Sequence, residues 1–217
     1  MLLDHDAQQL IDALIERLAA VGFAVAEDLL PAALVAGLIE AATSREAAGA
    51  MSRAAIGRNA ARALETHVRR VDAAWMDGSH VAEAEFLALA ESIRQAINRR
   101  LYLGLFEFEA QFLTYPPGGF YQRHLDSLAG TRNRIVSMVA YLNEGWETSH
   151  GGQLDVWRSP DDHGNPALTV EPRAGTVVLM LSEEIPHAAR PANAVRRVVA
   201  GWFRLNASGS ARVDPAR

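Results

Sequence analysis

The period of the hydrophobic pattern changes near residue 105, and this change limits the folds that the chain can adopt. Before it, apolar residues recur at helical spacing along residues 10–18, 31–39 and 86–101, the second stretch with Pro31 in its first turn. After it, short apolar runs alternate with polar residues or are bounded by Gly, Pro, Asn and Asp, with no helical pattern between them. The sequence therefore predicts an α+β fold, an antiparallel β-sandwich or barrel with the N-terminal helices packed on one side.

The expected strands fall mainly in the second half of the chain. One short strand and turn is predicted within residues 21–30, and the others at 107–112, 135–142, 153–157, 168–170, 176–181 and 196–203. Residues 43–70 hold Ser, Gly and scattered Arg without a dominant period, which predicts an irregular excursion. We expect a single domain over residues 1–217, in which 1–104 supply helical support and a covering loop and 105–205 form the β-barrel core.

Composition excludes several classes of function. The net charge is −5, with 21 Lys and Arg against 26 Asp and Glu, which argues against nucleic acid as a partner because phosphate binding depends on Lys and Arg. No apolar run reaches the roughly 20 residues that span a bilayer, and no basic segment leads into an apolar run at the N-terminus, so we expect no membrane partner and a cytoplasmic location. The chain has no Cys, so a metal site would have to use His and carboxylate ligands.

Three residues in the β half could form such a metal site. His124 and Asp126 lie two apart on a predicted extended segment, so their side chains share one face. This spacing is a weak signal alone, and a strand His bonded to a local Asp explains it at least as well. His187, directly after the apolar run 176–181, would complete a His/Asp/His set with open coordination positions, which suits non-haem Fe(II) in an oxygenase.

The last predicted strand contains two consecutive arginines that could bind an anion. Arg196 and Arg197 point to opposite faces, and the alternation alone does not say which of them faces the barrel interior. An inward guanidinium requires an anion, and a dicarboxylate co-substrate would satisfy it, whereas an arginine at a strand end can also be a surface residue. Tyr141 places a phenol on one face of another strand, although such a residue is more often a core aromatic.

Several longer motifs follow one another in a fixed order: Tyr115-Pro-Pro-Gly-Gly, His124-Leu-Asp126, Tyr141-Leu-Asn-Glu-Gly-Trp146, Gly151-Gly-Gln-Leu, Glu171-Pro-Arg-Ala-Gly175, Pro186-His187, and Arg196 with Trp202 six residues on. Together they resemble the 2-oxoglutarate and Fe(II)-dependent dioxygenases of the prolyl 4-hydroxylase superfamily. The likeness is greatest to prolyl hydroxylases of the hypoxia-inducible-factor type and to their bacterial relatives that modify elongation factor Tu. The resemblance implies a double-stranded β-helix, a jelly-roll or cupin-like barrel.

The resemblance also implies a role for each candidate residue. His124, Asp126 and His187 would bind Fe(II), with 2-oxoglutarate as co-substrate and ascorbate as a possible reductant. Arg196 would bind the distal carboxylate of 2-oxoglutarate, because the basic residue of this family lies nine or ten positions after the distal His and six before a Trp. Tyr141 would bond the same carboxylate. The other implied site residues are Tyr115 in the co-substrate pocket, and Arg134 and Trp202 near the substrate.

The implied activity is peptidyl-prolyl 4-hydroxylation of a protein loop, with elongation factor Tu as the candidate substrate. Residues 45–76 would then be a loop that covers the bound peptide, and its arginines would face an acidic partner, although a solvated charged loop explains them equally well. A second possibility is a 2-oxoglutarate-dependent hydroxylase of a free amino acid or small metabolite, since only the covering loops would differ. A third is a catalytically silent binding module, against which the complete triad together with Arg196 argues.

Overall fold

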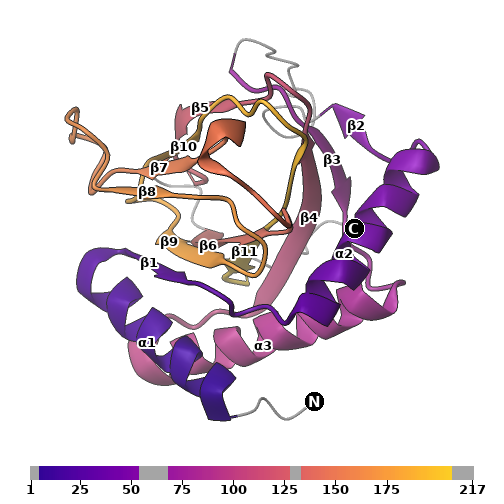
Figure 1. Cartoon of the computed structure of the whole chain (residues 1–217). Coiled ribbons are helices and arrows are strands. Elements are labelled where there is room, and N and C mark those ends of the chain that lie inside the picture. Colours follow the sequence, from indigo (N-terminus) through magenta and orange to yellow (C-terminus); the bar gives the residue numbers. More distant parts are fainter. Residues whose placement is uncertain (1–4, 54–67, 128–132, 207–217) are drawn as a thin grey trace, which may run out of the picture.

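The computed structural model describes residues 5–53, 68–127 and 133–206, which form two antiparallel β-sheets and three long helices (Figure 1). The helices are α1 (His5–Val21), α2 (Ala32–Ala47) and α3 (Val81–Leu101), and a short 3-10 helix covers Thr148–His150. No helix among these residues has the length and apolar character needed to cross a membrane.

The larger sheet has seven strands in the order β1-β9-β6-β11-β4-β3-β2, and the smaller has four in the order β5-β10-β7-β8. The strands of the larger sheet are β1 (Phe23–Ala26), β2 (Ser52–Arg53), β3 (Asp72–Trp75), β4 (Glu107–Tyr115), β6 (Arg134–Tyr141), β9 (Val177–Leu181) and β11 (Arg196–Arg204). Those of the smaller sheet are β5 (Tyr121–His124), β7 (Leu154–Val156), β8 (Leu168–Val170) and β10 (His187–Ala189). This arrangement agrees with the predicted β-barrel with helices on one side.

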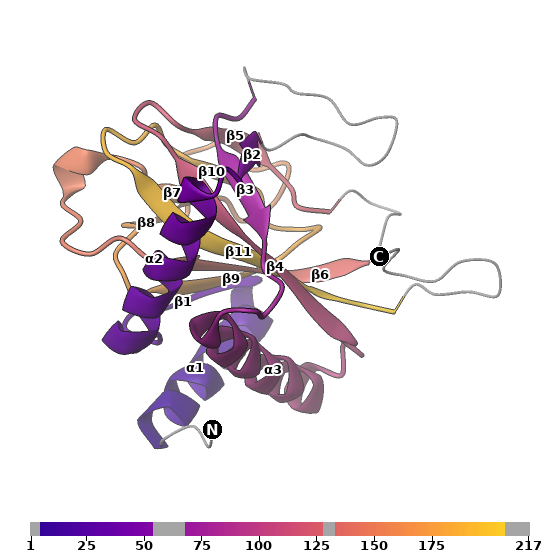
Figure 2. The same ribbon diagram turned by 90° about the vertical axis from the view of Figure 1, so that its right-hand side faces the viewer.

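The larger sheet separates two hydrophobic cores. On one face, α1, α2 and α3 pack against residues such as Phe112 and Phe203, and on the other face Val198 and Val139 pack against Val156 of the smaller sheet. The helices therefore lie on the far side of the large sheet from the small one, as Figure 2 shows from a second direction. The core between the two sheets also contains three of the predicted site residues, Tyr115, Tyr141 and Trp202.

The prediction of an irregular loop over residues 45–76 is wrong at both ends. Arg45 lies in the last turn of α2, and Asp72–Trp75 forms β3, which pairs with β4 and extends the large sheet. Residues 54–67 lie outside the described residues.

Two charged clusters explain why the last turn of α2 is helical. Arg45 forms an ion pair with the fully buried Glu83 of α3 and a second one with Asp77, at 2.9 Å. The Glu83 carboxylate also accepts from the backbone N–H groups of Asp77 and Gly78, at 3.1 and 3.0 Å. These bonds attach the end of α2 to the start of α3.

The second cluster joins α2 to the large sheet. Glu46 accepts two hydrogen bonds from the guanidinium of Arg197 on β11, at 3.1 and 2.9 Å, and a third from the Thr114 hydroxyl on β4. Arg197 therefore faces the helices. Because side chains alternate along a strand, Arg196 must face the opposite side, between the two sheets.

Candidate metal centre and co-substrate pocket

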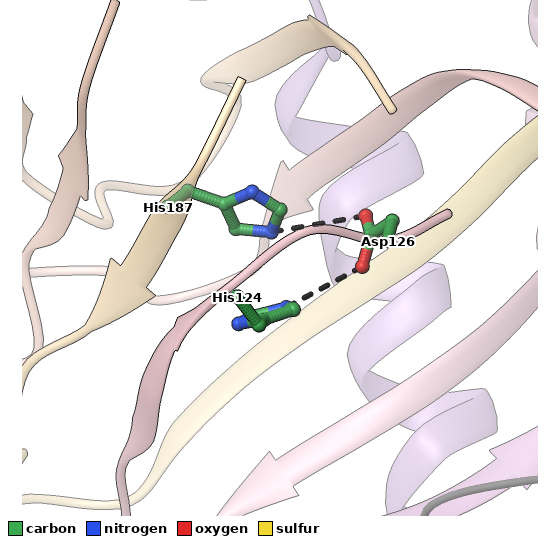
Figure 3. Close-up of side chains that lie close together, drawn as sticks. All are labelled: His124, Asp126 and His187. Atoms are coloured by element: carbon green, nitrogen blue, oxygen red, sulfur yellow. Dashed lines mark ion pairs between the residues drawn. The ribbon is translucent and has the colours of Figure 1, made fainter. Parts of the chain in front are cut away.

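The pairing of β5 with β10 brings His124, Asp126 and His187 together. His187 is the direct cross-strand partner of His124, and Asp126 follows β5 by two residues. Asp126 Oδ1 lies 3.4 Å from His124 Nε2, and its Oδ2 lies 3.7 Å from His187 Nε2, as Figure 3 shows. One ligand atom from each residue lies within 4.8 Å of the others, so a single ion could contact all three.

Backbone carbonyls orient both imidazole rings toward this point. His124 Nδ1 lies 2.7 Å from the carbonyl oxygen of Gln122, and His187 Nδ1 lies 3.3 Å from that of Ile185. Because a carbonyl oxygen can only accept, each Nδ1 carries the proton and each Nε2 presents its lone pair to the centre. This is the tautomer that a metal-binding imidazole needs.

The electrostatics of the triad favour an ionised Asp126 carboxylate beside a neutral His187. Burial opposes the charge on Asp126, but His187, His124 and the Ser137 hydroxyl together hold the pKa of Asp126 well below its usual range. Burial and the neighbouring His124 lower the pKa of His187 to about 4. Two imidazole nitrogens and one carboxylate, which leave half of an octahedron open, fit a divalent metal such as Fe(II).

Arg196 lies between the sheets, as the resemblance implies, and only 1% of it is exposed. Its guanidinium carbon lies 4.8 Å from the ring centre of Tyr115 and 5.3 Å from that of Tyr141, so all three predicted co-substrate residues meet. Four described arginines near the sheets, Arg134, Arg190, Arg197 and Arg204, each pair with a carboxylate, but Arg196 forms no ion pair with any described acidic residue. A buried cation of this kind suits an anionic ligand.

The hydroxyl of Tyr141 has no hydrogen-bond partner among the described residues, although it is buried. Burial raises the pKa of Tyr141 to about 12 against the opposing charge of Arg196, so the phenol keeps its proton and can donate it. A buried donor without an acceptor is uncommon in folded proteins. A ligand carboxylate beside Arg196 would satisfy this donor and the guanidinium together, so the residues present fit a carboxylate of 2-oxoglutarate.

Arg134 and Trp202 lie farther along the same face of the large sheet. The Arg134 guanidinium lies over the Trp202 ring at 3.7 Å, and Glu109 accepts from it at 2.8 Å. Trp202 is the cross-strand partner of Ser137, whose hydroxyl helps to lower the pKa of Asp126. The residues predicted near the substrate therefore lie together, on the side of the metal centre away from Arg196.

Sequence reasoning missed three residues that contact the site. Tyr121 stacks on His124, with the two ring centres 3.5 Å apart, and the Ser137 hydroxyl helps to lower the pKa of Asp126. Gly152 gives its carbonyl oxygen to Arg196 Nε at 2.8 Å. Ser137 could have been found as the polar residue on the same strand face as Tyr141, whereas Gly152 belongs to the Gly151-Gly-Gln-Leu motif, which by itself does not indicate a contact with Arg196.

Comparisons with known proteins agree with this site. Residues 110–204 match the model of the 2OG-Fe(II) oxygenase superfamily. A prolyl-4-hydroxylase from Pseudomonas putida is 38% identical to this chain and superimposes on it with a TM-score of 0.80. The match covers 90% of this chain and 99% of the Pseudomonas putida chain.

Two more distant structures share the fold. A prolyl hydroxylase from Trichoplax adhaerens, solved with a peptide of hypoxia inducible factor, is 22% identical, with 92% of this chain and 90% of that one covered and a TM-score of 0.80. A prolyl 4-hydroxylase from Phytophthora capsici is 20% identical, with 94% and 67% covered and a TM-score of 0.72. The family and the double-stranded β-helix predicted from the motifs are thus confirmed. The chain belongs to the 2OG-Fe(II) oxygenase superfamily and is a dioxygenase of the prolyl hydroxylase type.

Proposed function

We propose that this protein is a peptidyl-prolyl 4-hydroxylase that uses Fe(II), O2 and 2-oxoglutarate and acts on a proline of a bacterial protein, with elongation factor Tu as the candidate substrate. His124, Asp126 and His187 are the proposed iron ligands. Iron and 2-oxoglutarate supply the oxidation of an unactivated C–H bond, with succinate and carbon dioxide as co-products. Ascorbate is the proposed reductant, and it would keep the iron in the Fe(II) state.

The observation that carries this proposal is the pairing of a possible metal triad with a buried cation and a buried phenol. Arg196 and the Tyr141 hydroxyl are buried, lie close together and have no acidic partner among the described residues. Arg196 would bind one carboxylate of 2-oxoglutarate, Tyr141 would donate to it, and Tyr115 would line the pocket. The sheets around these side chains exclude water, which limits unproductive oxidation.

A protein substrate is supported by the side of the site away from Arg196. Trp202 and Arg134 lie together there, and the half-exposed Trp75 extends this aromatic surface, its ring centre 6.3 Å from that of Trp202. Such a surface suits a peptide chain with a proline ring. The solved complex of the Trichoplax adhaerens enzyme with a hypoxia-inducible-factor peptide supports this substrate class.

The test is incubation of the purified protein with Fe(II), 2-oxoglutarate, ascorbate and elongation factor Tu. We expect succinate release together with a mass gain of one oxygen atom on a single prolyl peptide. His124→Ala should abolish both, whereas the same change at the exposed His163 should abolish neither. Full turnover by His124→Ala with controlled metal content would contradict the iron assignment. Succinate release that depends on a free amino acid, with no modified protein, would favour the small-metabolite alternative.

A further inference from the structure

We propose that Gly152 and Trp146 are positioning residues that aim Arg196, and thereby set the affinity for 2-oxoglutarate. This inference rests on the proposed function, because it assigns to Arg196 the co-substrate carboxylate. The two residues belong to the turn that follows β6 and precedes β7, and neither is placed among the metal ligands.

One hydrogen bond fixes the orientation of the Arg196 guanidinium. The carbonyl oxygen of Gly152 accepts from Arg196 Nε at 2.8 Å, and both groups are buried from solvent. This bond uses the Nε–H group of the guanidinium, so the two terminal nitrogens, Nη1 and Nη2, are left for a ligand. The planar fork of an arginine binds a carboxylate through two parallel bonds only when its orientation is fixed.

Only glycine fits at position 152 without displacing its neighbours. Gly152 has a φ of +69°, which L residues rarely adopt. A Cβ atom there would lie 3.0 Å from Arg196 Cδ, 3.0 Å from the Cβ of Ala192 and 3.3 Å from the Trp146 ring. The Arg196 side chain therefore passes directly over the backbone of Gly152, and a methyl group would displace it.

Two hydrogen bonds hold the turn that contains Gly152. Trp146 donates its indole N–H to the carbonyl oxygen of Gly151 at 3.0 Å, and its ring is buried against Gly152. The N–H of Gly152 donates to the carbonyl oxygen of Pro191, also at 3.0 Å. The peptide group before Gly152 is thus held at both its carbonyl oxygen and its N–H, which fixes the backbone from which the next carbonyl, the one that accepts from Arg196, projects.

The test is direct binding of 2-oxoglutarate to the Mn(II)-loaded protein by calorimetry, with Gly152→Ala compared against Gly145→Ala. Gly145 is a matched control, because it has a φ of +60° but nothing within 4 Å of an added Cβ, so it carries the same backbone strain without the contact. We expect Gly152→Ala to raise the Kd for 2-oxoglutarate about 10- to 100-fold, the effect of losing a buried charged hydrogen bond. The affinity for Mn(II) alone should stay unchanged in both variants.

Trp146→Phe provides a second test if Gly152→Ala fails to fold. It keeps the ring but removes the indole donor, and we expect a Kd about 3- to 10-fold higher with unchanged Mn(II) affinity. If the unmodified protein binds 2-oxoglutarate and each variant that folds binds it as tightly as Gly145→Ala, the positioning role is wrong while the proposed function stands. If the unmodified protein does not bind 2-oxoglutarate at all, the proposed function itself fails.

Discussion

The unpartnered hydroxyl of Tyr141 should make the Tyr141→Phe variant more stable without co-substrate and less stable with it. In the described structure this hydroxyl is buried and has no hydrogen-bond partner. A buried polar group without a partner costs roughly 1–3 kcal/mol of folding free energy. Its removal should therefore raise the free energy of unfolding by about 1 kcal/mol, the low end of that range because the Arg196 charge lies nearby. For a chain of this length that corresponds to a melting temperature about 2–4 °C higher.

With 2-oxoglutarate bound, the sign should reverse. A hydrogen bond to a charged group contributes about 1.5–3 kcal/mol, so the variant should bind the co-substrate roughly 10- to 100-fold more weakly. At a fixed, saturating concentration of 2-oxoglutarate, a tenfold weaker Kd removes about 1.4 kcal/mol of ligand stabilisation. This exceeds the gain of about 1 kcal/mol in the unliganded protein, so the loaded variant should melt below the loaded wild type.

The assay is thermal unfolding of both proteins with Mn(II), in the absence and presence of 2-oxoglutarate. Tyr102→Phe is the control, since Tyr102 is 88% exposed and its loss of a hydroxyl should shift neither curve. An unliganded Tyr141→Phe protein that is less stable than the wild type would show that the hydroxyl has a partner. An unchanged affinity for 2-oxoglutarate would show that Tyr141 does not contact the co-substrate, and either result refutes the reasoning.

Two further predictions concern the ion pairs that anchor α2. Glu83→Gln should lower the free energy of unfolding by about 3 kcal/mol, the low end for a broken buried pair because Arg45 keeps some exposure. The control Glu91→Gln, on the surface of the same helix, should lower it by under about 0.5 kcal/mol. Urea unfolding measures both changes, and equal effects would contradict the role of burial. The hydrogen bonds from Arg197 lower the pKa of Glu46 in the folded protein below its ordinary 4.5, so the Glu46 carboxylate binds a proton more readily in the unfolded chain. The stabilisation from this pair is therefore complete above pH 4.5 and is lost as the pH falls through the pKa of Glu46 in the folded protein. Glu46→Gln should therefore flatten the loss of stability in acid, and identical acid limbs for the two proteins would show that this pair does not contribute.

The sequence predicted the classes of structure well because periodicity is a local signal. The stripe that contains Ile11, Leu14 and Leu18 forms the buried face of α1, and the alternating run before Tyr115 forms β4. Leu10 was placed in the same stripe but is 37% exposed, because it lies at the edge of that face.

Strand pairing across the chain was harder to predict. The sequence Asp72-Ala-Ala-Trp75 is short, has no alternation and gains its extended conformation from pairing with β4. The choice between Arg196 and Arg197 likewise could not be made from alternation. It is made in the structure by Glu46 on α2, which binds Arg197 and so leaves Arg196 to the pocket.

The proposed metal ligands could be selected from the sequence, and their surroundings could not. His124 and Asp126 form a recognisable spacing, and His187 gains meaning from its motif. The contacts of Ser137 and Gly152 depend on which distant side chain approaches them, and a single sequence does not contain that information.

The position of β10 between β5 and β7 has a consequence for the order in which the protein is made. His124 and Asp126 leave the ribosome first, but the ion cannot contact all three ligands until His187 has been synthesised and β10 has paired with both neighbours. A nascent chain that ends before β10 holds only two of the proposed ligands, so three-ligand binding of the proposed metal would require β10 to be in place. Metal binding would then stabilise chains that contain β10 over shorter ones.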